Sequence, residues 1–525
     1  MLIDARTLSE DEIIETDICI IGAGPAGISL AHEFLGQPFR VCLLESGGLE
    51  PDEQTESLSE GENIGLPYLA LKTTRFRYFG GTLGMGAWCA PLDEIDFEKR
   101  DWVPYSGWPF DKSHLDPFYE RARSILRLGS FDDDVEIEAA EHSLHLPFTT
   151  ERVITKIIQI GPPIPFGKVY RDEIERADNI RTYLYANVVN IETNDTAETV
   201  TRLRVACLQG NKFWVSARLF VLATGGIENA RLLLLSNKTQ STGLGNQNGL
   251  VGKFFMEHPH VESGVFNPSD AHVSGALYRL YNIDNVGSIR ALTLADQTLR
   301  HEKLLNFSAT FELPHSQLST GATSIRLLLE AIRQRKIPAD LFKHLSNIIF
   351  SLGNIAVTTY NGLFSGTPDQ IKFFRFYNRI EQSPDPHSRV TLSTERDGFG
   401  KKRAQLDWRL SAIDRRSMKR ANEIVRAELN RAGLGSLEIA LDVEDKSWPP
   451  SLTGGHHHMG TTRMHVDPKG GVVNEDCRLH ATSNLFVAGS SVFPTSGCAN
   501  PTLTIVALAI RLADHVKRLM KQSNV

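Results

Sequence analysis

The sequence is poor in cysteine, in long apolar runs and in positive charge, and each shortage excludes a class of protein. Six cysteines occur in 525 residues, and none is close enough to another to form a CxxC pair or an iron–sulfur ligand run. No uninterrupted apolar run approaches the ~18 residues of a membrane-spanning helix. The formal net charge of −7 offers no basic surface for nucleic acid or an anionic membrane. We therefore expect reduced structural thiols, no membrane span and no nucleic-acid partner.

The first fifteen residues also lack the pattern of an export signal, because they contain five acidic residues, one arginine and no apolar core. We expect a cytoplasmic protein, and export together with a signal-bearing partner subunit is the alternative. Hydrophobic residues make up 41% and charged residues 23% of the chain, as in an ordinary globular protein. The length predicts about two to four domains.

Residues 17–45 carry the strongest local pattern: an apolar run, a glycine-rich turn, a helical stretch and a second apolar run that ends in an acid. In this order Gly22 permits a sharp exit from the first strand, Gly24 lets the backbone approach a pyrophosphate, and Gly27 allows close helix packing. Glu45 would accept hydrogen bonds from an adenosine ribose and would repel a 2′-phosphate. The pattern predicts an adenine dinucleotide other than NADP, against the weaker alternative of a turn that binds nothing.

Three later glycine clusters predict that the chain returns to this dinucleotide. Residues 77–86 form a loop of glycines among aromatic and apolar residues, which suits a flat ligand, with an ordinary irregular loop as the alternative. Residues 219–226 read as an apolar strand that ends in glycines and precedes a helical stretch, and residues 485–491 repeat the strand and glycine. We therefore predict a discontinuous cofactor domain made of residues 1–110, 181–266 and 451–525.

The middle of the chain has a different pattern of apolar and polar residues. Alternating apolar and polar stretches over residues 267–450 predict an antiparallel sheet with one covered face, interrupted by helices at residues 324–351 and 414–432. We assign this block to a substrate domain and residues 111–180 to a helical or loop connector, with helical spacing at residues 114–127. The expected fold class is α/β, α+β overall: a doubly wound Rossmann-type domain plus an antiparallel domain flanked by helices.

The C-terminal quarter holds the side chains best suited to chemistry, which are three adjacent histidines, His456, His457 and His458, and Asn500 before Pro501. Consecutive residues of an extended segment point in opposite directions, and no carboxylate or cysteine lies at ligand spacing, so we expect no metal site. A helix is predicted to follow, with Pro501 at its first position and Asn500 as its N-cap.

Taken together, these motifs resemble the glucose-methanol-choline (GMC) family of flavoenzymes. The bacterial branch near sugar and polyol dehydrogenase flavoprotein subunits and pyranose oxidases is the most similar. The resemblance runs along nearly the whole length: the fingerprint with Glu45, the Arg-x-x-Gly-Gly-Thr loop at residues 77–82, and the segments at residues 223–225, 252–259, 457–460 and 500–502. It implies bound FAD and an antiparallel sheet that roofs the isoalloxazine ring.

The resemblance also implies a catalytic pair, which falls on His457 and Asn500. A neutral imidazole can accept a hydroxyl proton, so His457 is the expected general base, while the hydride would go to flavin N5. Asn500 could donate from its NH₂ group to the substrate oxygen. Gln382 and His456 are expected to contact the substrate, and His258 and His260 to be structural.

Expected cofactor contacts come from the fingerprint, the glycine clusters and the resemblance together. They are Gly22, Gly24, Pro25, Ala26, Gly27, Glu45, Ser46, Arg77, Gly80, Gly81, Thr82, Met85, Val188, Ala223, Gly225, Gly489, Pro501 and Thr502. Some family members tether FAD through a histidine just after the glycine loop, but residues 80–91 contain none. We therefore expect non-covalent FAD.

The expected activity is FAD-dependent oxidation of a secondary alcohol of a sugar, a glycoside or a related polyol, with oxygen or a quinone-like compound as electron acceptor. The alternatives are a non-redox lyase of the same fold, oxidation of a non-sugar alcohol and, less favoured, a non-catalytic flavoprotein subunit. A partner subunit or a homo-oligomer is compatible with each of these.

Overall fold

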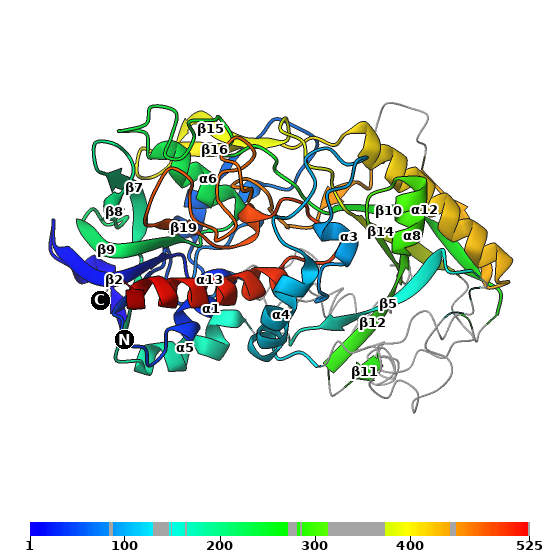
Figure 1. Ribbon diagram of the computed structural model, residues 1–525, viewed down its shortest axis with the longest axis horizontal. Coiled ribbons are helices and arrows are strands. Elements are labelled where there is room, and N and C mark those ends of the chain that lie inside the picture. The colour runs from blue at the N-terminus through cyan, green and yellow to red at the C-terminus, as the bar shows by residue number, and fades with distance from the viewer. Residues whose placement is uncertain are drawn as a thin grey trace, which may run out of the picture.

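The computed structural model describes residues 1–82, 88–129, 146, 148, 150–162, 165–270, 273, 281–283, 286–312, 373–441 and 448–522. The molecule is elongated, with one large sheet toward each end (Figure 1). The helix expected at residues 324–351 lies outside the described residues. No helix in the described part of the chain is long and apolar enough to cross a bilayer.

Eight strands form the first sheet. They are β1 (Leu2–Asp4), β2 (Ile13–Ile21), β3 (Val41–Leu44), β6 (Ile180–Leu184), β7 (Asn187–Thr193), β8 (Val200–Ala206), β9 (Lys212–Leu222) and β19 (Leu485–Val487). Their order is β1-β6-β3-β2-β9-β8-β7, with β19 paired to β9. The pairs from β1 to β9 and the β9–β19 pair are parallel, whereas β7 and β8 are added antiparallel. This confirms the doubly wound sheet.

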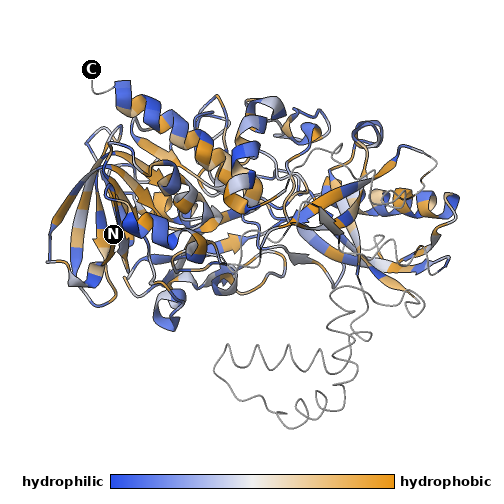
Figure 2. Ribbon diagram, turned by 90° about the horizontal axis from the view of Figure 1, so that it is seen from below, coloured by the Kyte–Doolittle hydropathy of each residue, from blue (hydrophilic) through white to orange (hydrophobic). Residues whose placement is uncertain are grey.

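Helices cover this sheet because its central strands are apolar on both faces. Every residue of β3 is buried, and so are the last four residues of β2. Helices α1 (Pro25–Glu33), α5 (Phe166–Arg176) and α6 (Gly226–Leu235) contact its strands, and α13 (Thr502–Gln522) and α4 (Lys112–Leu126) pack outside them. α13 packs against both α1 and α4, and its ribbon alternates between hydrophobic and hydrophilic residues up to the C-terminal end (Figure 2).

The second sheet is antiparallel, as predicted. Its strands are β5 (Val153–Ile160), β10 (Pro259–Pro268), β11 (Tyr281–Ile283), β12 (Val286–Leu294), β13 (Phe307–Glu312), β14 (Phe374–Ile380), β17 (Gly435–Ile439) and β18 (Thr453–Gly454). The order is β11-β12-β13-β14-β10-β17, while β18 pairs with β10 and β5 pairs with β12. The segment expected as a helical or loop connector thus also contributes a strand, β5.

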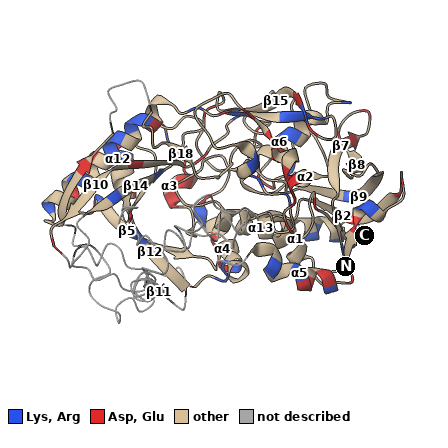
Figure 3. Ribbon diagram, turned by 180° about the vertical axis from the view of Figure 1, so that it is seen from behind, with Lys and Arg blue, Asp and Glu red and all other residues tan. Residues whose placement is uncertain are grey.

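One face of the second sheet is apolar and covered by α12 (Ala412–Arg431). On β14 the alternate residues Phe374, Phe376 and Ile380 are buried in one core with apolar residues of α12. Lysine and arginine residues mark α12 in the view from behind (Figure 3). Arg375, Tyr377 and Arg379 alternate with the buried residues of β14, so they lie on the opposite face of the strand.

A third, small sheet has the order β15-β16-β4 and packs around the fully buried Trp408. Its strands are β4 (Gly61–Asn63), β15 (Arg389–Arg396) and β16 (Lys402–Asp407). Short helices elsewhere in the described residues are α2 (Glu53–Glu56), α3 (Glu94–Phe97) and α8 (Asp296–Glu302). Short 3₁₀ turns occur at Ala5–Thr7, Ser57–Ser59, Leu71–Thr73 and Ser490–Val492. Helix α3 lies between the two large sheets (Figures 1 and 3).

Candidate active site

A cavity lies at the carboxyl ends of β2, β3 and β9, which is where doubly wound sheets bind ligands. Its lining includes most of the expected cofactor residues: Gly22, Gly24, Pro25, Ala26, Glu45, Ser46, Arg77, Gly81, Val188, Ala223, Gly225 and Gly489. A Cβ atom on Gly24, Gly225 or Gly489 would meet nothing within 4 Å, so these three positions face open space. With α1 beginning at Pro25 beside them, the cavity suits the pyrophosphate of FAD.

Other glycines of these motifs serve packing. Gly22 has φ +101°, and a Cβ there would lie 2.6 Å from the carbonyl oxygen of Ala223. A Cβ on Gly27 would lie 1.9 Å from the carbonyl oxygen of Gly22, so Gly27 has the expected role of close helix–strand contact. Gly80 differs from expectation: a Cβ there would lie 2.5 Å from the backbone nitrogen of Gly167, which places it against α5 and outside the cavity lining.

The Glu45 carboxylate lies in the wall of the cavity and supports the glycine turn through hydrogen bonds. Its side chain accepts the backbone N–H of Ala23 at 2.8 Å and that of Gly47 at 3.0 Å. Burial raises the pKa of Glu45, and these two N–H donors act in the opposite direction. Each carboxylate oxygen has a second lone pair, so the expected bonds to ribose hydroxyls are compatible with this bracing role.

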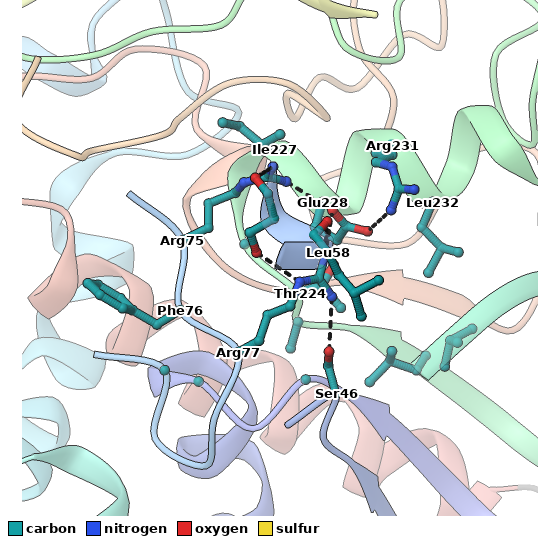
Figure 4. Close-up of a pocket in the computed structure, with 18 of the residues that line it drawn as sticks. Ser46, Leu58, Arg75, Phe76, Arg77, Thr224, Ile227, Glu228, Arg231 and Leu232 are labelled. Carbon is teal, nitrogen blue, oxygen red and sulfur yellow. Dashed lines mark hydrogen bonds and ion pairs between the residues drawn. The ribbon is translucent and has the colours of Figure 1, made fainter. Parts of the chain in front are cut away.

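A cluster of buried charges lines the same cavity (Figure 4). Glu228 pairs with Arg75 at 3.0 Å, with Arg77 at 3.2 Å and with Arg231 at 2.6 Å. Burial opposes ionisation of Glu228, but the attraction of the three guanidinium groups outweighs it and lowers the pKa to about 2. The sequence reasoning found only Arg77. The Glu-x-x-Arg spacing of residues 228 and 231 on a predicted helix was the available signal for Glu228 and Arg231.

Several expected cofactor contacts are not part of the cavity lining. Thr82, Pro501 and Thr502 lie outside it, and Met85 lies outside the described residues. The first intrahelical bond of α13 runs from the N–H of Ile505 to the carbonyl of Pro501 at 2.8 Å. The N-cap is therefore Pro501, one residue later than expected, and Asn500 is a half-buried residue just before the helix.

The three adjacent histidines face different neighbours, as expected. Nδ1 of His457 lies 2.9 Å from Nδ1 of His258, whereas Nε2 of His458 lies 3.1 Å from the hydroxyl of Tyr68. His456 is exposed and has φ +64°. The described residues contain no group of three or more side chains placed to hold a metal ion.

The structure gives His258 a contact that the sequence reasoning did not anticipate. His258 is fully buried, and its Nε2 lies 3.3 Å from the carbonyl oxygen of Ser496. The backbones of Met256 and Met459 exchange two hydrogen bonds of 3.0 Å each, which aligns the segments that carry His258 and His457. His258 thus links the histidine segment to the loop that leads to Asn500.

Burial sets the protonation of this histidine pair. It lowers the pKa of His258 to about 4 and lowers that of His457 well below 6.5, with nearby His258 and His260 adding to the shift at His457. Both rings are therefore neutral near pH 7. His457 is half-buried and is not part of the cavity lining, which His458 joins, and its neutral imidazole is a base near pH 7.

Gln382 has a different role from the expected substrate contact. It is fully buried, and its Oε1 accepts the N–H of Glu257 at 2.9 Å and the indole N–H of Trp408 at 3.0 Å. Its NH₂ group donates to the carbonyl of Arg409 at 2.9 Å. These contacts occupy the amide, so Gln382 holds strands and loops together. His456 is exposed next to His457, and its contact with the substrate stays a prediction.

The polar face of the second sheet lies beside His457. His260 on β10 stands directly opposite Arg379 on β14, and the rings of His260 and His457 are 6.1 Å apart. The Arg379 guanidinium lies 3.6 Å from the centroid of the Trp88 ring. Among the described residues no hydrogen-bond partner meets the buried Nε2 of His260. This face offers polar groups that can bind hydroxyls, a feature the sequence reasoning missed because it treated His260 as structural.

Comparisons with known proteins agree with this geometry. Residues 384–509 match the GMC oxidoreductase family model. The chain is 23% identical to the fructose dehydrogenase large subunit of Gluconobacter japonicus, over 98% of its own length and 99% of that protein. It is 26% identical to 2-methyl-1,2-propanediol dehydrogenase of Mycolicibacterium austroafricanum, over 96% of its own length and 95% of that protein. The solved structure of pyridoxine 4-oxidase from Mesorbium loti has a TM-score of 0.57 at 16% identity, covering 96% of this chain and 99% of that one.

Proposed function

We propose that this chain, which is a GMC oxidoreductase with FAD as its cofactor, oxidises a secondary alcohol of a sugar, a glycoside or a related polyol. The observation that carries the proposal is the half-buried, neutral imidazole of His457 beside the polar face that includes His260 and Arg379. The relatives support oxidation of a sugar or diol hydroxyl, since one is a fructose dehydrogenase subunit and another a diol dehydrogenase, although the diol named for the second has no secondary hydroxyl.

Oxidation of a secondary alcohol to a ketone removes the hydroxyl proton and a hydride from the same carbon. In our proposal His457 accepts the proton, because a neutral imidazole is a base near pH 7. Bound FAD supplies the acceptor for the hydride. Asn500 donates from its amide to the substrate oxygen. The polar groups of His260, of Tyr377, whose ring lies 5.7 Å from that of His260, and of Arg379 hold other hydroxyls of the substrate.

The residues of the cavity hold the cofactor without a covalent bond in this proposal. The open positions at Gly24, Gly225 and Gly489 leave room for the pyrophosphate, and the N-terminus of α1 attracts its charge. Glu45 binds the adenosine ribose. Denaturation should therefore release free flavin, and a flavin that stays with the precipitated chain would contradict this part of the proposal.

The test is anaerobic mixing of the purified holoenzyme with a panel of sugars, glycosides and polyols. We expect at least one to bleach the visible absorbance of the flavin, and its analogue deoxygenated at the reacting carbon to leave it unchanged. Admitting air to the reduced enzyme then separates oxygen from a quinone-like electron acceptor. Absence of bleaching across the panel, with activity on a cyanohydrin-like compound, would replace the proposal with the non-redox lyase.

A further inference from the structure

His258 and His457 face each other through their Nδ1 atoms. Their Nδ1 atoms lie 2.9 Å apart, and their ring planes meet at 75°. The other ring nitrogen of His258, Nε2, lies 3.3 Å from the carbonyl oxygen of Ser496. These three groups form a short hydrogen-bonded row that begins at a backbone carbonyl and ends at the proposed base.

The direction of each bond in this row follows from the donors and acceptors present. A carbonyl oxygen can only accept, so Nε2 of His258 carries a proton. Burial lowers the pKa of His258 to about 4, so the ring is neutral near pH 7 and its Nδ1 has a lone pair. Nδ1 of His457 must then be the donor, because two lone pairs would repel each other at 2.9 Å.

We propose that His258 is a positioning residue that fixes the tautomer of His457. With its proton on Nδ1, neutral His457 has its lone pair on Nε2, the nitrogen that His258 does not engage. The other tautomer would present an N–H to the alcohol and could not accept its proton. The inference rests on the proposed function, because a free lone pair matters only if His457 is the base.

The backbone around the two rings is held independently of the ring contact. Glu257 accepts the backbone N–H of His258 at 3.0 Å and that of His457 at 2.9 Å. Met256 and Met459 exchange backbone hydrogen bonds beside them. Replacing the His258 ring therefore leaves the frame that carries His457 in place, so variants at this position report on the ring contact.

Two amide substitutions separate the positioning role from a purely structural one. The oxygen of an asparagine reaches roughly the place of histidine Nδ1, so His258→Asn keeps an acceptor for His457. The NH₂ group of a glutamine reaches roughly the place of histidine Nε2, so His258→Gln keeps a donor for Ser496 but removes the acceptor. If His258 only anchored the Ser496 loop, the glutamine variant would be the better substitute.

The first measurement is the limiting rate of anaerobic flavin reduction by an alcohol found active in the panel. We expect His258→Asn to stay within about tenfold of the wild type and His258→Gln to fall on the order of 100-fold, since the base is then partly in the wrong tautomer. Equal rates in the two variants, or a faster glutamine variant, would overturn the proposal.

The second measurement needs neither substrate nor turnover. In holoenzyme labelled with nitrogen-15 histidine, the ring signals of His457 are identified by their loss in His457→Ala. We expect the Nδ1–H tautomer in the wild type and in His258→Asn, and a mixture or the Nε2–H tautomer in His258→Gln. An Nε2–H ring in the wild type overturns the proposal whatever the activity. If the wild type has the Nδ1–H tautomer but His457→Ala turns over at an undiminished rate, the proposed function is overturned instead.

Discussion

The buried carboxylate of Glu257 accepts the backbone N–H of His457 at 2.9 Å, although the two residues are 200 positions apart in the sequence. The same carboxylate accepts the N–H of Gly455 at 2.9 Å and that of His258 at 3.0 Å, and it also accepts the hydroxyl of Tyr68. One side chain therefore holds the backbone on both sides of the histidine pair, which makes the position of the proposed base depend on Glu257.

Replacing Glu257 with glutamine should loosen this support. An amide has one accepting oxygen, so its NH₂ group would face backbone N–H donors and leave at least one of them unpaired, at a cost of about 1–3 kcal/mol. We expect a lower melting temperature and a flavin reduction rate about 10- to 100-fold slower, measured by calorimetry and stopped flow. The control is Glu262→Gln on β10, the strand that begins two residues after Glu257, because the Glu262 carboxylate is partly exposed and should matter little. An unchanged rate in Glu257→Gln would contradict the supporting role.

The Glu45 carboxylate should be needed for cofactor affinity. Glu45→Gln puts an NH₂ group against the N–H of Ala23 or Gly47, which disturbs the glycine turn that the pyrophosphate must approach. We expect the Kd for FAD to rise about 10- to 100-fold, corresponding to about 1.4–2.8 kcal/mol. Flavin fluorescence titration of the apoprotein measures it, with the exposed Glu53→Gln as the matched control. A Kd equal to that of the control would show that Glu45 does not support the turn.

Arg100 and Glu381 form an ion pair whose side chains are completely buried. Removing one partner leaves an uncompensated charge, so Arg100→Met should lower the free energy of unfolding by about 3–5 kcal/mol. The double variant Arg100→Met/Glu381→Gln should recover part of that loss. Lys72→Met, which breaks the exposed pair with Glu60, should cost less than about 1 kcal/mol. Equal melting temperatures for Arg100→Met and Lys72→Met would refute this assignment.

Burial of His258 predicts a specific loss of stability in acid. Its pKa falls from 6.5 to about 4 on folding, so between these values the unfolded chain binds more protons than the folded one. The stabilising contribution is present above pH 6.5 and is lost as the pH falls toward 4. From pH 7 to pH 5 the wild type should lose about 2 kcal/mol relative to His258→Asn, which has no titrating group there. Thermal unfolding of both proteins at the two pH values measures this difference, and parallel shifts would contradict it.

The cofactor half of the fold could be predicted because its signals are local. Gly22, Gly24 and Gly27 lie close together in the sequence, and Glu45 follows the next strand directly. The spacing of these residues was therefore enough to predict the positions of β2, α1 and β3. The helix expected from Pro501 is also present, although it begins at Thr502. Such elements depend on turn geometry and on apolar periodicity, which a single sequence displays directly.

The supports of the site could not be predicted in the same way. Glu257 and His258 are single polar residues without a periodic pattern, and their partners in the histidine segment lie about 200 positions away. The pairing of β5 with β12 likewise depends on a long-range register that no local motif specifies. Gln382 was misassigned because a polar residue beside a strand looks like a binding group until its partners are known.

The central claim, that His457 accepts the hydroxyl proton, is tested most directly by single-turnover reduction of the flavin in His457→Ala. With FAD content and melting temperature matched to the wild type, the account predicts a limiting rate lower by about 10²- to 10⁴-fold at pH 7. A variant that binds FAD, stays folded and is reduced by the same alcohol at the wild-type rate would contradict it.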